Sequence, residues 1–315
     1  MLGVDIGATS TTAVLLDPAG TVIGRGAAAG ANPNAHPVDV AAARLADAIR
    51  AALGGRDPRG VGGCVLGMAG VSRWADPVVA TAFVAAVRDT GVPHDPAVVS
   101  DAEAAFNSAT GEPDGTVLIA GTGSVVGRVE DGRMRLLAGG HGWLLGDEGS
   151  AFWIGRAAVR ATVAAMRPAP GVRAAAPGGP LARAVVTALL GDAPEGTTAV
   201  GTTAGGVTAG GVTAADLLTA VTTAAPIQLA RLAVLVSEHA DDPAAADILD
   251  RAAAHLADLV ATVRGPGERT PVVLAGNVIA ADTPVCRRLT AMLAGPVIHA
   301  GDPAVGAARL ALRRL

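Results

Sequence analysis

The sequence predicts an α/β protein that consists of two similar halves. The chain has 315 residues, of which 50% are hydrophobic and 17% are charged, so its composition allows a large buried core and differs from that of a disordered protein. A domain usually has roughly 100–200 residues, so this length indicates two domains. Two strand–turn–strand patterns, at residues 2–16 and 116–130, each open a series of strand and helix patterns. We therefore expect two α/β halves that face a cleft.

The first half contains strand and helix patterns up to a turn-rich segment. Apolar runs predict strands at 2–6, 13–16, 64–68 and 98–99, and a further strand that starts at 21–23. Helical spacing of apolar residues predicts helices over 39–53, 77–87 and 102–109. Asp17-Pro18-Ala19-Gly20 is a typical turn, because Pro presets φ and Gly accepts a positive φ. Gly111–Gly115 is rich in turn residues and is the candidate domain boundary.

The pattern restarts after this boundary. Strands are predicted at 116–120, 125–130 and 271–275, and helices over 151–165, 226–239 and 304–315. A tight turn at Gly121–Ser124 joins the first two strands, and Asp131-Gly132 is a hairpin signal. Residues 203–214 contain Gly-Gly-Val-Thr twice, a low-complexity pattern typical of a loop or a helix linker.

Charge and cysteine content exclude several classes of protein. The formal net charge is −4, all 24 basic residues are Arg, and no basic run is present, which argues against nucleic acid and anionic membranes as partners. Cys64 and Cys286 are too few for a disulfide framework or a four-thiolate metal site within one chain, and the six histidines show no metal-ligand spacing. No apolar run approaches the roughly 18 residues of a spanning helix, and the segment after Met1 lacks the basic start of a signal peptide. These features predict a soluble, cytoplasmic protein.

Asp5 lies within an otherwise apolar strand pattern. A buried carboxylate is costly unless a cation or hydrogen-bond donors satisfy it. The structural interpretation is that Asp5 accepts hydrogen bonds from the amides of the following turn. The functional interpretation is that it faces a hydrated Mg²⁺, because the Gly7-Ala8-Thr9-Ser10 turn offers N–H groups and hydroxyls suited to phosphate oxygens.

A second turn of similar chemistry follows the second buried strand. In Gly121-Thr122-Gly123-Ser124, the glycines permit close backbone approach and the hydroxyls supply donors. Neither turn is a P-loop, because the chain contains no Lys. Two such turns in corresponding places predict a clamp that holds one polyphosphate from both sides.

Further polar residues have both a structural and a catalytic interpretation. Asp101 follows a strand and precedes a helix, so it is either a helix N-cap or a general base at the carboxyl end of a strand. Asp147 and Glu148 precede a helix, where acids favour the helix dipole, and they could also accept hydrogen bonds from sugar hydroxyls. His141 is not part of a recognisable Ser-His-Asp pattern, so this criterion predicts a structural role for it. Trp143 is predicted to be a core residue.

Five motifs resemble those of the BadF/BadG-type ATPase family, which includes N-acetylglucosamine kinases and bacterial glucosamine kinases. The motifs are Gly3-Val4-Asp5-Ile6-Gly7-Ala8-Thr9-Ser10, Ser100-Asp101-Ala102, Gly121-Thr122-Gly123-Ser124, Gly146-Asp147-Glu148-Gly149-Ser150-Ala151 and Leu274-Ala275-Gly276-Asn277. Their order and spacing cover nearly the whole chain. The resemblance places the chain in the superfamily of sugar kinases, actin and heat-shock chaperones. It implies two ribonuclease-H-like domains, at 1–113 and 114–302, with a closing helix at 303–315 that packs back on the first domain.

The resemblance also implies roles for individual residues. Asp5 would organise Mg²⁺ through water, and Asp101 would take the proton of the sugar 6-hydroxyl as that oxygen attacks the γ-phosphate of ATP. The residues implied at the nucleotide are Gly7, Thr9, Ser10, Gly121, Thr122, Gly123, Ser124, Gly276 and Ala280. The residues implied at the amino sugar are Asn32, Asn34, Asp101, Gly140, His141, Gly142, Asp147 and Glu148. A homodimer is expected, because dimers are the commonest assembly.

The substrate expected from these residues is glucosamine, with N-acetylglucosamine as its nearest competitor. N-acetylglucosamine kinases of the family commonly have Trp between the two ring-contacting glycines, where this chain has His141. The segment from Gly30 to His36 also lacks an aromatic residue. An acetamide methyl prefers an apolar or aromatic wall, whereas a free ammonium prefers acids and water.

Three other classes of protein remain as alternatives. A dehydratase activator of the same family needs a close pair of cysteines for a bridging iron–sulfur cluster, and Cys64 and Cys286 are far apart in sequence. A sugar-responsive transcription regulator needs a DNA-binding extension, whereas here the first phosphate motif begins at Gly3. The presence of Asp101 argues against a non-catalytic sugar-binding or scaffold protein.

Overall fold

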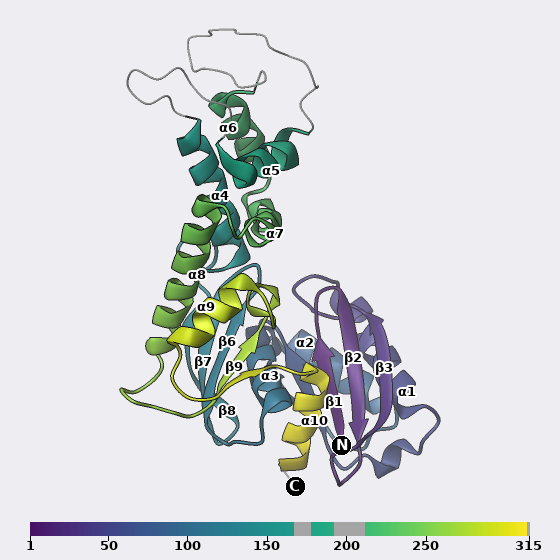
Figure 1. The fold of residues 1–315 in the computed structure, drawn as a ribbon. Helices are drawn as coiled ribbons and strands as arrows, with labels where there is room; N and C mark the ends of the chain where they lie inside the picture. Colours follow the sequence, from purple (N-terminus) through teal and green to yellow (C-terminus); the bar gives the residue numbers. More distant parts are fainter. Residues whose placement is uncertain (167–177, 192–211, 314–315) are drawn as a thin grey trace, which may run out of the picture.

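Two five-stranded mixed sheets form the framework of a computed structural model that describes residues 1–166, 178–191 and 212–313 (Figure 1). The first sheet has the order β3 (Val22–Ala29), β2 (Ser10–Leu16), β1 (Leu2–Ile6), β4 (Cys64–Met68) and β5 (Ala97–Ser100). The second has the order β10 (Val297–His299), β9 (Val272–Ala275), β6 (Gly115–Ala120), β7 (Ser124–Glu130) and β8 (Arg133–Gly139). The α/β class and its duplication are therefore confirmed.

The two sheets share one pattern of strand directions. In each, the central strand, β1 or β6, pairs antiparallel with the next strand in sequence and parallel with a strand on its other side. The parallel strands β1, β4 and β5 therefore end at one edge of the first sheet, and β6, β9 and β10 end at one edge of the second. Open α/β sheets bind their ligands at the carboxyl ends of such strands.

Helices cover both faces of the first sheet. On one face, α1 (Val38–Leu53) and α2 (Pro77–Arg88) contribute Leu45, Ile49 and Phe83 to a buried cluster with β1 and β4. The other face is covered by α10 (Pro303–Arg313) and α3 (Asp101–Ala109). Close approach of α10 requires glycine, because a Cβ on Gly3 would lie 2.1 Å from the backbone nitrogen of Ala308.

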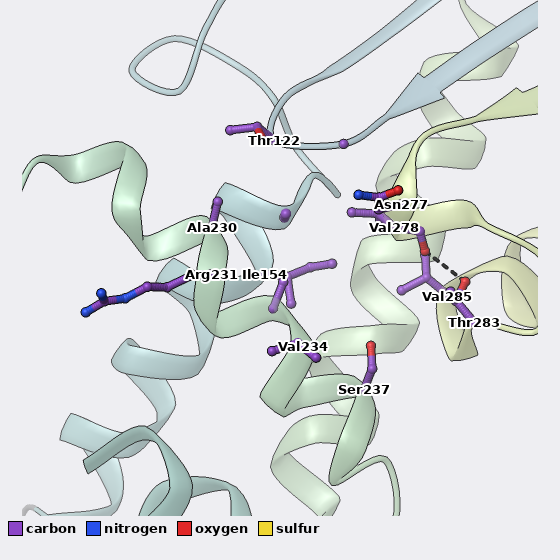
Figure 2. A pocket seen from close by; sticks show the side chains of 13 residues that line it. Thr122, Ile154, Ala230, Arg231, Val234, Ser237, Asn277, Val278, Thr283 and Val285 are labelled. Carbon is purple, nitrogen blue, oxygen red and sulfur yellow. Dashed lines mark hydrogen bonds between the residues drawn. The ribbon is translucent and has the colours of Figure 1, made fainter. Parts of the chain in front are cut away.

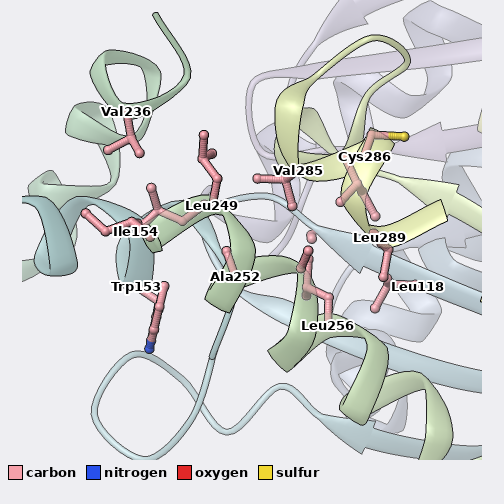
Figure 3. Packing of buried hydrophobic residues seen from close by; sticks show 14 of the residues in the cluster. Leu118, Trp153, Ile154, Val236, Leu249, Ala252, Leu256, Val285, Cys286 and Leu289 are labelled. Atoms are coloured by element: carbon pink, nitrogen blue, oxygen red, sulfur yellow. The ribbon is translucent and has the colours of Figure 1, made fainter. Parts of the chain in front are cut away.

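The second sheet is covered by a larger apolar core. Helices α4 (Ala151–Ala165), α8 (Pro243–Ala261) and α9 (Pro284–Met292) bury Ile154, Leu249, Leu256 and Leu289 against β6 and β9 (Figure 3). Helices α5 (Gly179–Leu190) and α6 (Ala214–Thr223) lie at the end of α4 that is remote from both sheets, with α7 (Ala233–Glu238) between them and the sheet (Figure 1). Four short 3₁₀ segments complete the described elements: η1 (Pro58–Gly60), η2 (Val71–Ala75), η3 (Pro226–Leu232) and η4 (Asn277–Ile279).

The predicted elements agree with the structure in most places. One prediction is wrong: residues 226–239 do not form a single helix but the 3₁₀ segment η3 followed by α7. The reason is close packing, because a Cβ on Gly155 would lie 1.9 Å from the carbonyl oxygen of Leu229, so η3 runs directly against α4. The low-complexity repeat lies outside the described residues except at its last three positions.

No single helix among the described residues is long and apolar enough to cross a membrane. The segments Ala214–Thr223 and Pro226–Glu238 meet the length and composition criteria only as a pair, with a bend of 119° between them.

Candidate active site

The Gly7–Ser10 turn joins β1 to β2, and its carbonyl groups are directed toward the segment that follows β3. Three hydrogen bonds fix these carbonyls: Asn32 N to Gly7 O at 3.2 Å, His36 Nε2 to Ala8 O at 2.7 Å and Gly30 N to Thr9 O at 3.0 Å. The N–H groups of Ala8 and Thr9 have no acceptor among the described residues. Because successive free backbone N–H groups bind anions, this exposed turn is suited to phosphate oxygens.

Asn32 and Asn34 lie beside this turn but differ in what their side chains do. Asn32 is buried, and its amide donates to the carbonyl of Ala69 at 3.0 Å while its Oδ1 accepts from the N–H of Asn34 at 2.8 Å. Asn34 is exposed, and its amide nitrogen lies against Gly70, where a Cβ would be 2.5 Å away. The structure therefore leaves the amide of Asn34 available for a ligand and uses that of Asn32 to shape the segment.

Asp5 lies near the end of β1, on the face of the sheet that α10 covers. This follows from Gly3, which contacts α10 and lies two residues earlier on the same face. No described residue donates a hydrogen bond to the Asp5 carboxylate, so the turn amides do not satisfy it as the structural interpretation required. Burial, followed by the negative charges of Asp101 and Asp302, raises the pKa of Asp5 to about 6.

Asp101 is the first residue of α3, and the preceding residue, Ser100, caps the helix in its place. The N-cap is Ser100, whose Oγ accepts from Glu103 N at 3.1 Å while the Glu103 carboxylate accepts from Ser100 N at 3.0 Å. The capping interpretation of Asp101 is therefore wrong. Burial raises the pKa of Asp101, and hydrogen bonds from the backbone N–H groups of Ala102 and Asp101 partly oppose this shift. A half-buried carboxylate of raised pKa at a strand end is suited to accept a proton.

The Gly121–Ser124 turn repeats the arrangement of the first turn. Its carbonyls face α4, since Ala151 N donates to Gly121 O at 2.8 Å and Phe152 N donates to Thr122 O at 3.3 Å. The N–H groups of Thr122 and Gly123 have no acceptor among the described residues. Both turns thus use their carbonyls for internal hydrogen bonds and leave two adjacent N–H groups free.

The Asp147 carboxylate stabilises this second turn. Asp147 is only 8% exposed, and its Oδ1 accepts from Ser124 N at 3.1 Å. A Cβ on Gly123 would lie 2.7 Å from the same carboxylate, so glycine is needed there. The Ser124 hydroxyl is buried and donates to the carbonyl of Glu148 at 2.9 Å, which corrects the expectation that this hydroxyl supplies a donor to phosphate.

The loop after β8 carries the remaining residues predicted to bind the sugar. Gly140 and Gly142 adopt positive φ values of 67° and 79°, which only glycine accepts readily. His141 and Glu148 are exposed and lie close together, since a Cβ on Gly146 would lie 3.2 Å from the His141 Cβ and 3.7 Å from Glu148 Oε2. The loop therefore presents an imidazole and a carboxylate to solvent.

Trp143 in the same loop is not a core residue. It is 37% exposed, and its ring lies 5.6 Å from that of Phe152 at the start of α4. This aromatic pair is a partly exposed apolar surface beside the second turn, since Phe152 donates its N–H to Thr122.

A pocket of about 510 Å³ adjoins the second turn (Figure 2). The residues that line it are Gly121, Thr122, Ala151, Ile154, Ala230, Arg231, Ala233, Val234, Ser237, Asn277, Val278, Thr283 and Val285. Figure 2 shows Ile154 and Val278 directed into this space, whereas the Arg231 guanidinium points away from it. Such a mostly apolar pocket beside a set of free N–H groups suits a ligand with a flat apolar part and an anionic part.

Two predicted nucleotide residues flank η4, which contributes Asn277 and Val278 to the lining of this pocket. Gly276 precedes the lining residue Asn277 and has a φ of 99°, and a Cβ there would lie 2.3 Å from the carbonyl oxygen of Ala120. Ala280 is exposed and ends η4. The sequence analysis missed the residues that α7 and η3 contribute to the pocket, because their position depends on the packing of η3 against α4.

Comparison with known proteins assigns the chain to a family. The model of the BadF/BadG/BcrA/BcrD ATPase family matches residues 2–311. The chain belongs to this family. A curated relative, the N-acetylmuramic acid/N-acetylglucosamine kinase of Clostridium acetobutylicum, is 35% identical over 99 residues, which is 31% of this chain and 31% of that relative.

Solved structures similar to this BadF-family protein share its fold over almost its whole length. A putative N-acetylglucosamine kinase from Chromobacterium violaceum has 24% identity and a TM-score of 0.65, and covers 99% of this chain and 98% of its own. One from Porphyromonas gingivalis has 20% identity and a TM-score of 0.67, with 99% of both chains covered. A glucokinase from Streptomyces griseus, in complex with glucose and an ATP analogue, has 20% identity and a TM-score of 0.54, also with 99% of both chains covered. The fold is therefore the two-domain, ribonuclease-H-like fold of sugar kinases.

The residues of this BadF-family protein fit a magnesium ion that is bound together with phosphate. No group of three or more His, Cys, Asp or Glu in the described ranges could enclose a metal by itself. Mg²⁺ usually retains several waters and binds through one or two carboxylates and the phosphates of its substrate. Asp5 fits this pattern, because its carboxylate lacks donors and lies near a turn with two free N–H groups.

The site residues form two groups, one on each sheet. Asp5, Asp101, Asn34 and the first turn belong to the first sheet, whereas the second turn and the pocket belong to the second. Helix α3 contacts both sheets: it starts at Asp101, and its Phe106 lies in a buried cluster with Val117 and Val273 of β6 and β9. Asp101 is thus carried on the helix that joins the two groups.

Proposed function

We propose that this chain is an ATP-dependent amino-sugar kinase that phosphorylates the 6-hydroxyl of glucosamine. The observation that carries the proposal is the position of Asp101, a half-buried carboxylate that does not cap its own helix and lies near the unsatisfied Asp5. Phosphoryl transfer depends on positioning and on charge neutralisation more than on covalent chemistry by the protein. Free N–H groups and a carboxylate for a hydrated metal supply these two needs, and Asp101 adds a base.

In this mechanism Asp101 accepts the proton of the sugar hydroxyl while the hydroxyl oxygen attacks the γ-phosphorus of ATP. The new bond joins O6 of the sugar to phosphorus, and the bond between phosphorus and the bridging oxygen of ADP breaks. The N–H groups of Ala8, Thr9, Thr122 and Gly123 hold the phosphate oxygens. When bound, Mg²⁺ would neutralise charge that develops on these oxygens, and Asp5 would orient its water ligands.

The pocket beside the second turn would take the adenosine of ATP. Its aliphatic lining suits a flat base, and Gly276 and Ala280, on either side of η4, would lie near that base. Thr122 both lines the pocket and belongs to the second turn, so one residue spans the boundary between base and phosphates. This placement supports ATP as the phosphoryl donor.

Glucosamine is favoured over N-acetylglucosamine because of the loop after β8. His141 and Glu148 present polar groups to solvent where an acetyl group would need an apolar wall, and the Glu148 carboxylate suits an ammonium. Gly140 and Gly142 would let the backbone approach the ring, and Asn34 would bind a hydroxyl. Asp147 and Asn32 would act by holding the second turn and the segment that follows β3.

N-acetylglucosamine is the second candidate substrate, and a specific observation favours it. The partly exposed Trp143, which contacts Phe152, is an aromatic surface close to the proposed sugar loop. The names of the relatives from Clostridium acetobutylicum and Chromobacterium violaceum also include N-acetylglucosamine.

A dehydratase-activator function is disfavoured by the cysteines. Cys64 is buried in β4 of the first sheet, and burial raises the pKa of its thiol to about 12. Cys286 is buried in α9 over the second sheet. The two thiols belong to different hydrophobic clusters. They therefore do not form the close pair that an iron–sulfur cluster bridging two subunits would need.

The domain limits and the assembly are also proposals. We divide the chain into 1–113, 114–302 and the terminal helix 303–315, and we expect the first two to move toward one another when both ligands bind. We expect a homodimer in solution. Light scattering coupled to gel filtration tests this, and a mass near 31 kDa would contradict it, because one chain has a mass of 30.7 kDa.

A coupled ADP-release assay with MgATP tests the proposed activity. It is run without sugar and with glucosamine, N-acetylglucosamine, glucose or mannosamine. We expect sugar-dependent ADP release with the highest kcat/KM for glucosamine. A higher kcat/KM for N-acetylglucosamine would retain the kinase and overturn the substrate preference, and release that is indifferent to every sugar would overturn the kinase itself.

A further inference from the structure

His36 joins the proposed sugar segment to the first phosphate turn. Its Nε2 lies 2.7 Å from the carbonyl oxygen of Ala8. A carbonyl oxygen only accepts hydrogen bonds, so Nε2 carries the proton and donates. The Ala8 carbonyl belongs to the same peptide group as the N–H of Thr9, which is one of the two N–H groups free for phosphate. The side chain of His36 therefore acts on the orientation of the peptide groups that we assign to ATP.

The segment that carries His36 is fixed by Asn32. The carbonyl of Asn32 accepts the N–H groups of Ala35 and His36 at 3.0 and 3.1 Å, and its side chain accepts from Asn34 N. These bonds bend residues 32–36 into one compact turn. A ligand that binds Asn34 would therefore restrict the turn as a unit, and with it the ring of His36.

Among the three hydrogen bonds that hold the carbonyls of the first turn, only that of His36 comes from a side chain. The other two come from the backbone N–H groups of Gly30 and Asn32 and survive most substitutions. Removal of the imidazole therefore weakens the connection and leaves the backbone pairing between β2 and β3 in place. This makes His36 the position at which the connection can be tested.

We propose that His36 is a positioning residue that couples amino-sugar binding to ATP binding. This inference rests on the proposed function. The sugar fixes the 32–36 turn, and His36 holds the Ala8 carbonyl away from the site. The N–H of Thr9, in the same peptide group, then meets the phosphates in the correct orientation. Because such coupling is reciprocal, the sugar and ATP raise each other's affinity by the same factor.

The test is isothermal titration of the full chain with a non-hydrolysable ATP analogue and Mg²⁺, with and without saturating sugar. Glucosamine and N-acetylglucosamine are used in separate series, so the result does not depend on the substrate preference. We expect the sugar to lower the Kd of the analogue in the wild type. In His36→Ala, loss of one hydrogen bond should reduce this coupling factor roughly 2- to 10-fold. The same variant should raise the KM for ATP at saturating sugar more than it lowers kcat.

Three further variants separate coupling from a structural effect. His36→Gln retains an N–H donor and should restore much of the coupling. His36→Phe retains a ring but has no hydrogen-bond donor, so we expect it to behave like His36→Ala. It replaces His36→Ala if the alanine variant does not fold. His94→Ala removes an exposed histidine before β5 and should leave the coupling factor unchanged.

The outcomes distinguish this inference from the proposed function. A wild type that binds no analogue and shows no sugar-dependent ADP release would overturn the proposed function. A wild type that is an active kinase but shows no coupling, or a folded donor-free variant that retains the full coupling factor, would overturn the role of His36 and leave the kinase intact.

Discussion

Asp101 is the residue on which the proposed chemistry depends most. We predict that Asp101→Asn lowers kcat by about 10²–10⁴, the usual contribution of a positioned acid–base group, and leaves ATP affinity nearly unchanged. Steady-state kinetics and analogue titration measure the two effects. The exposed Asp47→Asn in α1 is the matched control. Near-normal turnover in Asp101→Asn would remove Asp101 from the mechanism.

The same residue sets an expectation for pH dependence. A general base must be ionised to accept a proton, and burial raises the pKa of Asp101 above the usual range of an aspartate. kcat/KM should therefore fall as the pH falls through this raised pKa, and the acid limb should be absent from the residual activity of Asp101→Asn.

The ionised carboxylate of Asp5 should lower the free energy of unfolding. Its pKa rises from 3.8 to about 6 in the folded chain, so the ionised form is disfavoured by folding. The free energy of unfolding should fall as the pH rises from about 4 to above 6, by up to about 3 kcal/mol if the whole shift acts on stability. We predict that Asp5→Asn has a higher Tm than the wild type at pH 8 and a similar Tm at pH 4.

Thermal unfolding at both pH values, without nucleotide, measures this effect. A Tm difference that does not depend on pH would contradict the assigned cause. The variant should also need more Mg²⁺ for half-maximal activity, and a wild-type Mg²⁺ titration would count against the proposed role of Asp5.

The sequence shows the candidate residues of the site more readily than the contacts that their side chains make. The chemistry of Asp5 and the two turns is local, because Asp5 interrupts an apolar strand and Gly, Thr and Ser follow a buried strand within a few residues. The sequence Ser100-Asp101-Ala102-Glu103 also has the pattern of a capping box, which indicates Ser100 and not Asp101 as the N-cap. The bonds of Asp147 to Ser124 and of His36 to Ala8 join residues that are 23 and 28 positions apart, and no local pattern encodes them.

At the scale of elements, the position of α10 depends on glycine. A Cβ on Gly306 would lie 1.9 Å from the carbonyl oxygen of Ala104 in α3, so the two helices meet at backbone distance. We predict that Gly306→Ala lowers the free energy of unfolding by about 1–3 kcal/mol, the usual cost of overpacking. Chemical denaturation measures it.

Gly111→Ala is the matched control, since no atom lies within 4 Å of a Cβ there and its φ is not positive. Equal stability of the two variants would contradict the close contact of α10 with α3.

Sequence patterns predict some of the helices and strands better than others. Strands β1, β4 and β6 are largely apolar runs, interrupted in β1 by Asp5, so their composition alone predicts them. β3 extends six residues beyond the predicted start because Gly24, Arg25 and Gly26 give no alternation, and its pairing with β2 defines it. No helix was assigned to α8, although Asp242 and Pro243 form a helix start, because its many alanines weaken the contrast between its faces.

At the scale of the molecule, the two groups of site residues must act on one substrate pair. Among the described residues no hydrogen bond or ion pair joins Asp5, Asp101 or the first turn directly to the second turn. Closure would exclude water and so prevent wasteful hydrolysis of ATP. We predict that the radius of gyration in small-angle scattering falls when an ATP analogue and the sugar are both present, and falls less with either alone. An unchanged radius with both ligands would contradict closure.

The central claim is that the chain transfers phosphate from ATP to a sugar hydroxyl, and product analysis tests it most directly. The full chain is incubated with MgATP and glucosamine, and ³¹P NMR follows ADP, free phosphate and sugar phosphate in one sample. We expect one glucosamine 6-phosphate for each ADP, and formation of both products at least about 10²-fold slower in Asp101→Asn. ADP accompanied by free phosphate alone would contradict it and would show an ATPase.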